Sequence, residues 1–220
     1  MIIEHQSKLV LSALESLLST YAAGKELKSI YNECKDIFLS SDDFSSKLKS
    51  LDALIGKAGY AELEDVIFDL VLVHFLSAIE HDEEYFDSDE WLDIEEQTVN
   101  RGTELLNVFL YINEATDTDA EISLDDFLNE FLLTDMDEFQ DEFKIYEPLI
   151  ENDLEEAEVD DLIALKTKLA DDSAIKEFLV PMVMFFQTPA DTRMLEQYKS
   201  KTNLFEQSVL ASLLAFNNQI

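Results

Sequence analysis

The stretch LVLSALESLLSTY, residues 9–21, carries the pattern that decides the fold. Its apolar residues recur at the 3.6-residue period of an α-helix, and the pattern stops at Gly24. The same spacing returns in residues 27–38 and in residues 44–55. Residues 62–79 are apolar nearly all round, which is typical of a central buried helix. A buried strand over residues 71–75 is the alternative there, but the length and the acidic first turn favour a helix.

Further helix signals continue along the chain. Ser88 is the expected N-cap of a helix that runs over residues 91–112, with a bend at Gly102. Ser123 is the expected start of a second helix, and Thr134 that of a third, which continues through residues 136–146. These signals predict helices joined by short polar links.

The prolines mark the expected ends and bends of the later helices. Pro148 is predicted near the end of the helix that starts at Thr134, and Pro181 is predicted to kink a helix over residues 175–186. Another amphipathic stretch covers residues 159–169. The pair Thr188 and Pro189 predicts a helix start before the last segment.

Glycine and proline together number only seven in 220 residues. Sheets need many tight turns and therefore many glycines, so this scarcity favours long helices. No Gly/Ser-rich linker marks a boundary. The sequence predicts one all-α domain over residues 1–220, an irregular bundle of about nine or ten helices.

The sequence also indicates where the protein works. Residues 1–18 lack the basic leader and cleavage site of a signal peptide, and no apolar stretch reaches the roughly 20 residues of a membrane span. Cys34 is the only cysteine, and it lies on an apolar helical stripe as a small core residue. A single cysteine excludes an intrachain disulfide and fits a reducing compartment. We therefore expect a cytoplasmic protein.

The negative charge is concentrated in the middle of the chain. Residues 61–165 carry 35 acidic residues against only Arg101 and Lys144, whereas both ends of the chain are balanced. A general solubility strategy would spread acids over the entire chain, so a local role is the better explanation. The predicted acidic surface centres on a set of clustered carboxylates: Asp82, Glu83, Glu84, Asp87, Asp89, Glu90, Asp135, Asp137, Glu138, Asp141 and Glu142.

Such a surface accelerates the encounter with a basic protein. Nucleic acid and anionic membranes are poor direct partners, because phosphate contacts need Lys and Arg clusters that are missing here. We expect a non-enzymatic protein-binding module. Its partner is a nucleic-acid-binding protein whose groove the carboxylates occupy, or a basic nuclease-like toxin held by an inhibitor or immunity protein. A solvated face without a partner is the alternative.

Residues 115–127 resemble a degenerate EF-hand calcium loop with the start of its exiting helix. The resemblance places oxygen donors at Asp117, Asp119, Glu121 and Asp126, whereas Ala115 and Ala120 depart from the motif's first ligand and its glycine. It implies weak calcium binding, and no other cofactor is predicted.

Two histidines give the alternative of a metal-dependent protein or an enzyme. His74 and His81 lie seven residues apart, two helical turns, with acidic residues next to His81. No histidine metal motif, Gly-rich phosphate loop or nucleophile motif occurs, so a non-enzymatic role is favoured. A pocket where histidine and carboxylates converge would instead favour chemistry.

Overall fold

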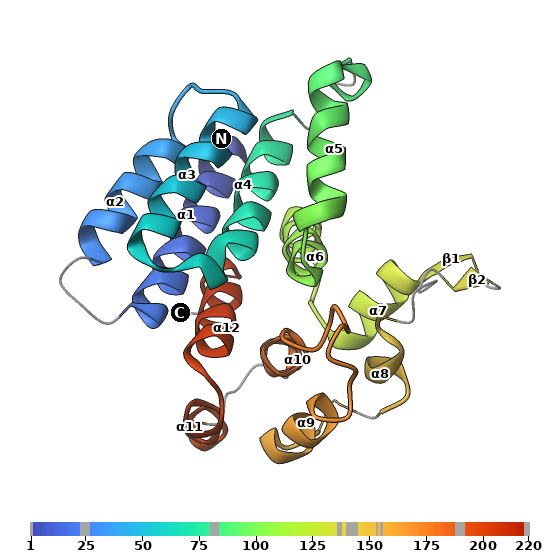
Figure 1. Ribbon diagram of the computed structural model, residues 1–220. Coiled ribbons are helices and arrows are strands. Elements are labelled where there is room, and N and C mark those ends of the chain that lie inside the picture. The colour runs from blue at the N-terminus through green and yellow to red at the C-terminus, as the bar shows by residue number, and fades with distance from the viewer. Residues whose placement is uncertain are drawn as a thin grey trace. The chain divides into compact units, whose positions relative to one another are not determined.

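The computed structural model describes residues 2–22, 27–79, 84–135, 138–139, 145–152, 154, 156–187 and 192–217. These residues form an all-α protein with twelve α-helices in the described part of the chain (Figure 1). The chain divides into two compact units, and the single domain over residues 1–220 stays a prediction. The first unit contains Met1–Leu106 and Ala211–Ile220, and the second contains Asn107–Leu210.

Four helices form the body of the first unit (Figure 1). They are α1 (Ile2–Tyr21), α2 (Leu27–Phe38), α3 (Phe44–Ala58) and α4 (Glu64–Ile79). Helix α4 packs against α1 and α3, while α2 packs against α1 and α3. All eight residues from Val66 to Val73 are buried, which confirms the predicted central helix and excludes the strand.

The ends of these helices follow from their capping residues. The Asp43 carboxylate accepts a hydrogen bond from the Ser46 backbone N–H at 2.8 Å and thereby starts α3. Gly59 ends α3 in the left-handed conformation, with φ 79°, where a residue with a side chain is strained. A 3₁₀ turn, Ala61–Leu63, then leads into α4.

The predicted helix over residues 91–112 is instead two helices. A 3₁₀ turn, Tyr85–Asp87, precedes α5 (Asp89–Arg101), and α6 (Glu104–Thr118) follows after a break. Ser88 is the N-cap of α5, as predicted, and accepts a hydrogen bond from the Trp91 backbone N–H at 3.1 Å. Gly102 leaves the helix with extended backbone angles instead of bending it. A Cβ at Gly102 would lie 2.7 Å from the Thr98 carbonyl oxygen, so glycine is needed at this close approach.

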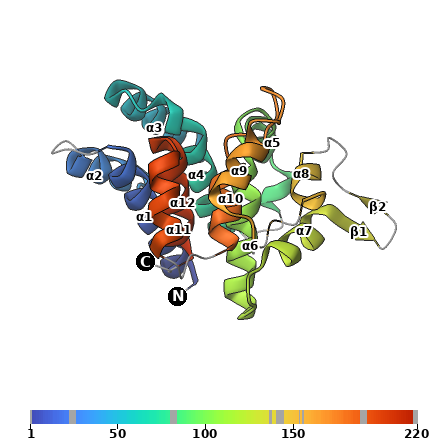
Figure 2. The same ribbon diagram turned by 90° about the horizontal axis from the view of Figure 1, so that it is seen from below.

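The second unit contains most of α6 and the later elements (Figure 2). These elements are α7 (Leu124–Leu132), β1 (Leu133–Asp135), β2 (Glu138–Phe139), α8 (Glu147–Ile150), α9 (Val159–Lys166), α10 (Leu179–Phe186), α11 (Thr192–Lys201) and α12 (Leu204–Phe216). Helix α9 packs against α10 and α11. The chain passes from one unit to the other within α6 and within α12.

The helix predicted from Thr134 is wrong, because strands β1 and β2 form a short antiparallel pair there, with Leu133 opposite Phe139. Acidic residues three or four positions apart, such as Asp137 and Asp141, would repel one another on one face of a helix. This repulsion disfavours the predicted helix.

Pro148 and Pro181 each lie in the first turn of a helix. Pro148 is the second residue of α8 instead of lying near the end of a helix, and Pro181 is the third residue of α10. Backbone N–H groups in the first turn have no partner within the helix, so proline is tolerated there and the predicted kink at Pro181 does not arise. Thr188 and Pro189 lie outside the described residues.

Candidate binding surface on helix α5

Helix α5 belongs to the first unit and has one buried face. Ile94 is fully buried, and Trp91, Thr98 and Arg101 are partly buried on the same side of the helix. These positions recur at intervals of three and four residues, which places them on one stripe. The opposite stripe is therefore free to face solvent.

Aromatic contacts hold the N-terminal end of α5. The ring of Phe86 lies edge-on to that of Trp91, with 4.9 Å between ring centroids. Tyr85 makes a similar contact with Phe75 of α4, at 5.6 Å. Two successive residues of the 3₁₀ turn thus connect the start of α5 to α4.

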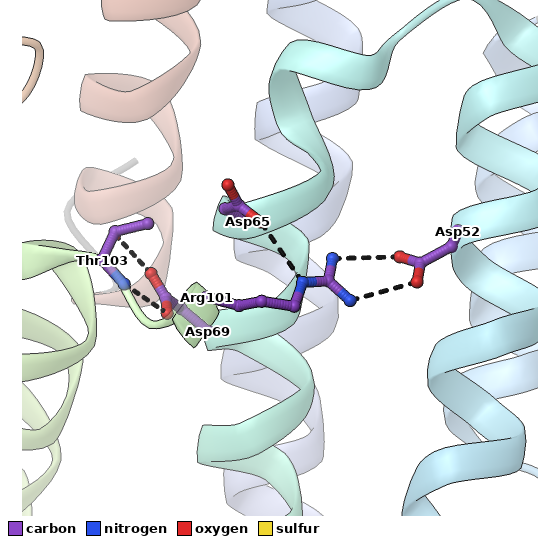
Figure 3. A network of polar contacts seen from close by, with 5 residues as sticks. All are labelled: Asp52, Asp65, Asp69, Arg101 and Thr103. Atoms are coloured by element: carbon purple, nitrogen blue, oxygen red, sulfur yellow. Dashed lines mark hydrogen bonds and ion pairs between the residues drawn. The ribbon is translucent and has the colours of Figure 1, made fainter. Parts of the chain in front are cut away.

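Arg101 holds the C-terminal end of α5 (Figure 3). Its guanidinium donates two hydrogen bonds to the Asp52 carboxylate on α3, at 3.0 and 3.1 Å, and one to Asp65 on α4, at 3.3 Å. It also lies 5.1 Å from the ring centroid of Phe68. Arg101 is thus turned inward, where it joins three helices and does not neutralise the outer face of α5.

Asp69 fixes the break between α5 and α6 (Figure 3). This fully buried carboxylate accepts hydrogen bonds from the Thr103 backbone N–H at 3.1 Å and from the Thr103 hydroxyl at 2.5 Å. The Thr103 hydroxyl oxygen in turn accepts the Leu105 backbone N–H at 3.1 Å and so caps α6. Burial raises the pKa of Asp69 well above its ordinary value, although the Thr103 bonds oppose that rise.

The outer face of α5 combines exposed apolar side chains with carboxylates. Leu92 is 58% exposed and Val99 is 86% exposed, and both lie opposite the buried Ile94. They are seven residues apart, two turns along one stripe. We define the α5 outer face by these two residues and the exposed acids around them, Asp89, Asp93, Glu95 and Glu96.

Among the described residues, no basic side chain compensates the charge of the α5 outer face. Neighbouring carboxylates such as Asp89 and Asp93, or Asp93 and Glu96, stand three or four residues apart, where like charges destabilise a helix by about 0.2–0.5 kcal/mol per pair. Within the described ranges, no Lys or Arg forms an ion pair with them. A cation from another molecule would relieve this repulsion.

The other predicted surface acids divide between the described and undescribed residues. Glu84, Asp87, Asp89 and Glu90 are all exposed at or near the start of α5. Asp135 and Glu138 lie on β1 and β2, but their side chains are outside the described part. The remaining predicted acids also lie outside the described residues: Asp82, Glu83, Asp137, Asp141 and Glu142. Residues 61–106 belong to the first unit and residues 107–165 to the second, so each unit carries its own share of the acids.

Of the two predicted histidines, only His74 lies among the described residues. His74 is partly buried on α4, and its Nε2 lies 2.9 Å from the Ser7 hydroxyl oxygen on α1. Burial lowers the pKa of His74, and the nearby Lys47 lowers it further. His81 lies outside the described residues. His74 does line a small cavity with Lys47 and Asp42.

The segment that resembles an EF-hand loop has a different form. Residues 115–118 are the last turn of α6, Ala115 is buried, and α7 begins at Leu124. Asp119, the first residue after α6, has φ 54°, and the next backbone N–H, that of Ala120, donates to the Ala115 carbonyl at 2.8 Å and closes the helix end. Only residues 119–123 link the two helices, too few for the twelve-residue calcium loop.

Asp117 thus lies in α6, Asp126 in α7, and Asp119 and Glu121 in the short link. Among the residues that the structure describes, no group of three or more His, Cys, Asp or Glu side chains could hold a metal ion. Cys34 is fully buried, and burial raises the pKa of its thiol to about 12, with a smaller effect from Glu33. Its predicted place in the core is confirmed.

Sequence inspection missed Asp69, Thr103 and the inward position of Arg101. Two signals were present: Asp69 is the only acid in the apolar run of residues 66–79, and Arg101 is one of only two basic residues between positions 61 and 165. Neither signal names a partner, because Asp69 and Thr103 are 34 residues apart.

No described helix is long and apolar enough to cross a membrane. Searches against protein-family models, curated proteins and solved structures found no match. The α5 outer face is therefore characterised by its own side chains alone.

Proposed function

We propose that the protein is a protein-binding module whose α5 outer face docks on a basic protein partner. The observation that carries this proposal is the placement of Leu92 and Val99, exposed among carboxylates, opposite the buried Ile94. Both ends of α5 are fixed by Phe86, Tyr85 and Arg101, so the face is presented on a rigid helix.

The apolar and acidic residues have separate roles in this proposal. Complete burial of a Leu or Val side chain contributes about 1.5–3 kcal/mol, so Leu92 and Val99 supply the anchors. The carboxylates attract a basic surface over a distance, raise the association rate and set the orientation. A partner with basic residues around an apolar pocket matches both features.

An inhibitor or immunity protein is the form of this function that the charge supports. A nucleic-acid-binding protein or a nuclease carries a basic surface for phosphate, and carboxylates on α5 can occupy it in place of the phosphates. We therefore place such proteins first among the partner classes to be tested.

The first experiment identifies the partner through α5. A photo-crosslinking amino acid replaces Val99, and cells of the source organism are irradiated. The same amino acid at Leu39, which is also exposed but lies just after α2, is the matched control. We expect a basic protein to crosslink at position 99 and not at position 39. Crosslinks of equal yield at both positions, or at neither, would contradict the proposal.

The second experiment measures the affinity of the purified partner by titration calorimetry at two salt concentrations. The outer-face variant changes one Asp and two Glu: Asp93→Asn, Glu95→Gln and Glu96→Gln. The control variant makes the same changes at exposed acids outside residues 61–165: Asp172→Asn, Glu177→Gln and Glu196→Gln.

We expect the outer-face variant to weaken binding roughly tenfold at low salt, and less at high salt, because the lost attraction is screened. The control variant should change the affinity less than about threefold. Replacing both anchors, Leu92→Ser and Val99→Ser, should weaken binding at both salt concentrations, because burial of apolar surface is not screened by salt. Equal losses of affinity in the outer-face and control variants would show that net charge alone causes the effect, and would reject docking at α5.

A further inference from the structure

The first unit contains a small cavity away from α5. Its volume is about 70 Å³, and its walls come from the end of α2, the start of α3, the middle of α4 and the link before α3. Most of the wall is apolar, with the rings of Phe38, Phe44 and Phe75 as its largest components. Phe44 and Phe75 lie 5.2 Å apart between ring centroids, so the aromatic part of the wall is continuous.

One cation, Lys47, is among the residues that line this largely apolar cavity. The Lys47 ammonium donates a hydrogen bond to the Phe38 carbonyl oxygen at 3.0 Å, at the C-terminus of α2. An ammonium group has three N–H donors, so this bond leaves two for other acceptors. Burial lowers the pKa of Lys47, while Asp42 opposes that effect. A bound anion would offset the desolvation of the ammonium.

The other polar groups on the wall, His74 and Asp42, already have hydrogen-bond partners. Lys47 is therefore the group that would select a ligand. His74 is already paired with Ser7, and its lowered pKa favours the neutral imidazole. Asp42 is exposed, and its carboxylate accepts a hydrogen bond from the Ser40 hydroxyl at 3.0 Å. A ligand in the cavity would therefore meet the Lys47 ammonium, one neutral ring and aromatic walls, with the exposed Asp42 carboxylate as the negative group on the wall.

We propose that this cavity binds a short-chain carboxylate, with its carboxylate on the Lys47 ammonium and its alkyl end against Phe38, Phe44 and Phe75. The size supports this class, since one water molecule needs roughly 10–15 Å³ of such a cavity and a volume of about 70 Å³ therefore holds only a few small groups. About three to five non-hydrogen atoms fit, as in acetate or propionate. This site shares no residue with the α5 outer face, although its Phe75 ring also contacts Tyr85 in the turn before α5.

The test is a titration with propionate, followed by NMR of the His74 ring at constant ionic strength. Propionamide has nearly the same size and shape but no charge, and it is the matched control ligand. Ligands of about five non-hydrogen atoms bind weakly, so we expect a saturable shift with a Kd of roughly 1–10 mM for propionate. A shift that does not saturate, or an equal response to propionamide, would overturn the proposal.

Two variants test the contribution of the Lys47 charge. Lys47→Met removes the ammonium and keeps the apolar stem, and Lys49→Met makes the same change at an exposed lysine on the same helix. We expect Lys47→Met to weaken propionate binding at least about tenfold and Lys49→Met to leave it within about twofold. Equal effects of the two variants would reject the role of Lys47.

Lys47→Met also removes the hydrogen bond to the end of α2 and could therefore unfold the protein. A third variant tests the cavity and leaves that bond in place. Ala78→Leu keeps the ammonium and places a larger side chain at an exposed position on the cavity wall. We expect it to abolish the propionate shift while the helical circular dichroism spectrum is retained. Unchanged propionate binding in the folded Ala78→Leu variant would exclude this cavity as the site.

Discussion

Among the described residues, each of the two units buries one carboxylate, and the two carboxylates are held in different ways. Asp69 of the first unit is fully buried and takes its hydrogen bonds from the neutral Thr103. Glu206 of the second unit is 5% exposed, and its carboxylate lies 3.0 Å from the Lys166 ammonium. It also accepts the Asn203 backbone N–H at 3.1 Å and so completes a capping box at the start of α12.

The comparison shows that a very acidic chain can use buried acids as structural parts. The Asp69 carboxylate positions the N-terminus of α6 without a cation, whereas the Glu206 carboxylate is balanced by one. Removing a partner should therefore have different consequences in the two units. An uncompensated buried charge costs more than an unpaired neutral donor.

The largest effect is expected from Lys166→Met in the second unit. This change leaves Glu206 buried without its cation and should lower the free energy of unfolding by about 2–4 kcal/mol in urea denaturation. Lys168→Met removes an exposed lysine just beyond α9, and we expect it to cost less than about 0.5 kcal/mol. Adding Glu206→Gln to Lys166→Met should recover more than half of the loss, because Gln still accepts the Asn203 bond. A loss from Lys166→Met no greater than that from Lys168→Met would remove the contrast between the units.

A smaller effect is expected at Asp69. Asp69→Ala leaves the Thr103 N–H and hydroxyl without their acceptor and should cost about 2–3 kcal/mol. Asp69→Asn retains an acceptor oxygen and removes a buried charge, so it should cost less than about 1 kcal/mol. Fluorescence of Trp91, the only tryptophan, reports unfolding of α5 next to this junction. Equal losses in the two variants would show that acceptance of the Thr103 bonds is not what Asp69 contributes.

The same carboxylate gives a pH dependence whose sign follows from its raised pKa. The native state binds the proton more tightly than the unfolded state, whose Asp pKa is about 3.9. The stability that protonated Asp69 contributes is fully present below that value and is lost as pH rises through the folded-state pKa.

We therefore expect the unfolding free energy of the wild type, minus that of Asp69→Asn, to fall with rising pH by up to about 1.4 kcal/mol per pH unit within this window. Urea denaturation of both proteins across the acidic range measures it. The difference cancels the titration of acids common to both. A difference that is flat, or that rises with pH, would show that Asp69 is not desolvated as the structure indicates.

The long helices with a local apolar pattern could be predicted from sequence, but the break between α5 and α6 could not. The apolar periodicity of residues 9–21 and the apolar run of residues 66–73 gave α1 and α4, since each pattern is local. The break after Arg101 was missed, because Thr103 caps α6 only with the help of Asp69 on another helix. The α5 outer face was missed for a similar reason, because it depends on which side of α5 is buried. Leu92 resembles any other apolar helical residue until Ile94 is seen to face inward.

The smallest effect is expected from Arg101→Met, which tests whether burial of the partner sets the cost of losing a cation. Asp52 and Asp65 keep side-chain exposures of 37% and 59%, so water can solvate both carboxylates when the guanidinium is gone. We expect a loss of about 0.5–1 kcal/mol, and a smaller loss at high salt, by urea denaturation followed through Trp91. The free energy of unfolding of Arg101→Lys should lie between those of the wild type and Arg101→Met. Lys keeps the charge but cannot form the two parallel bonds to Asp52. A loss as large as that of Lys166→Met would show that the joining of three helices by Arg101, and not the burial of its partners, governs the cost.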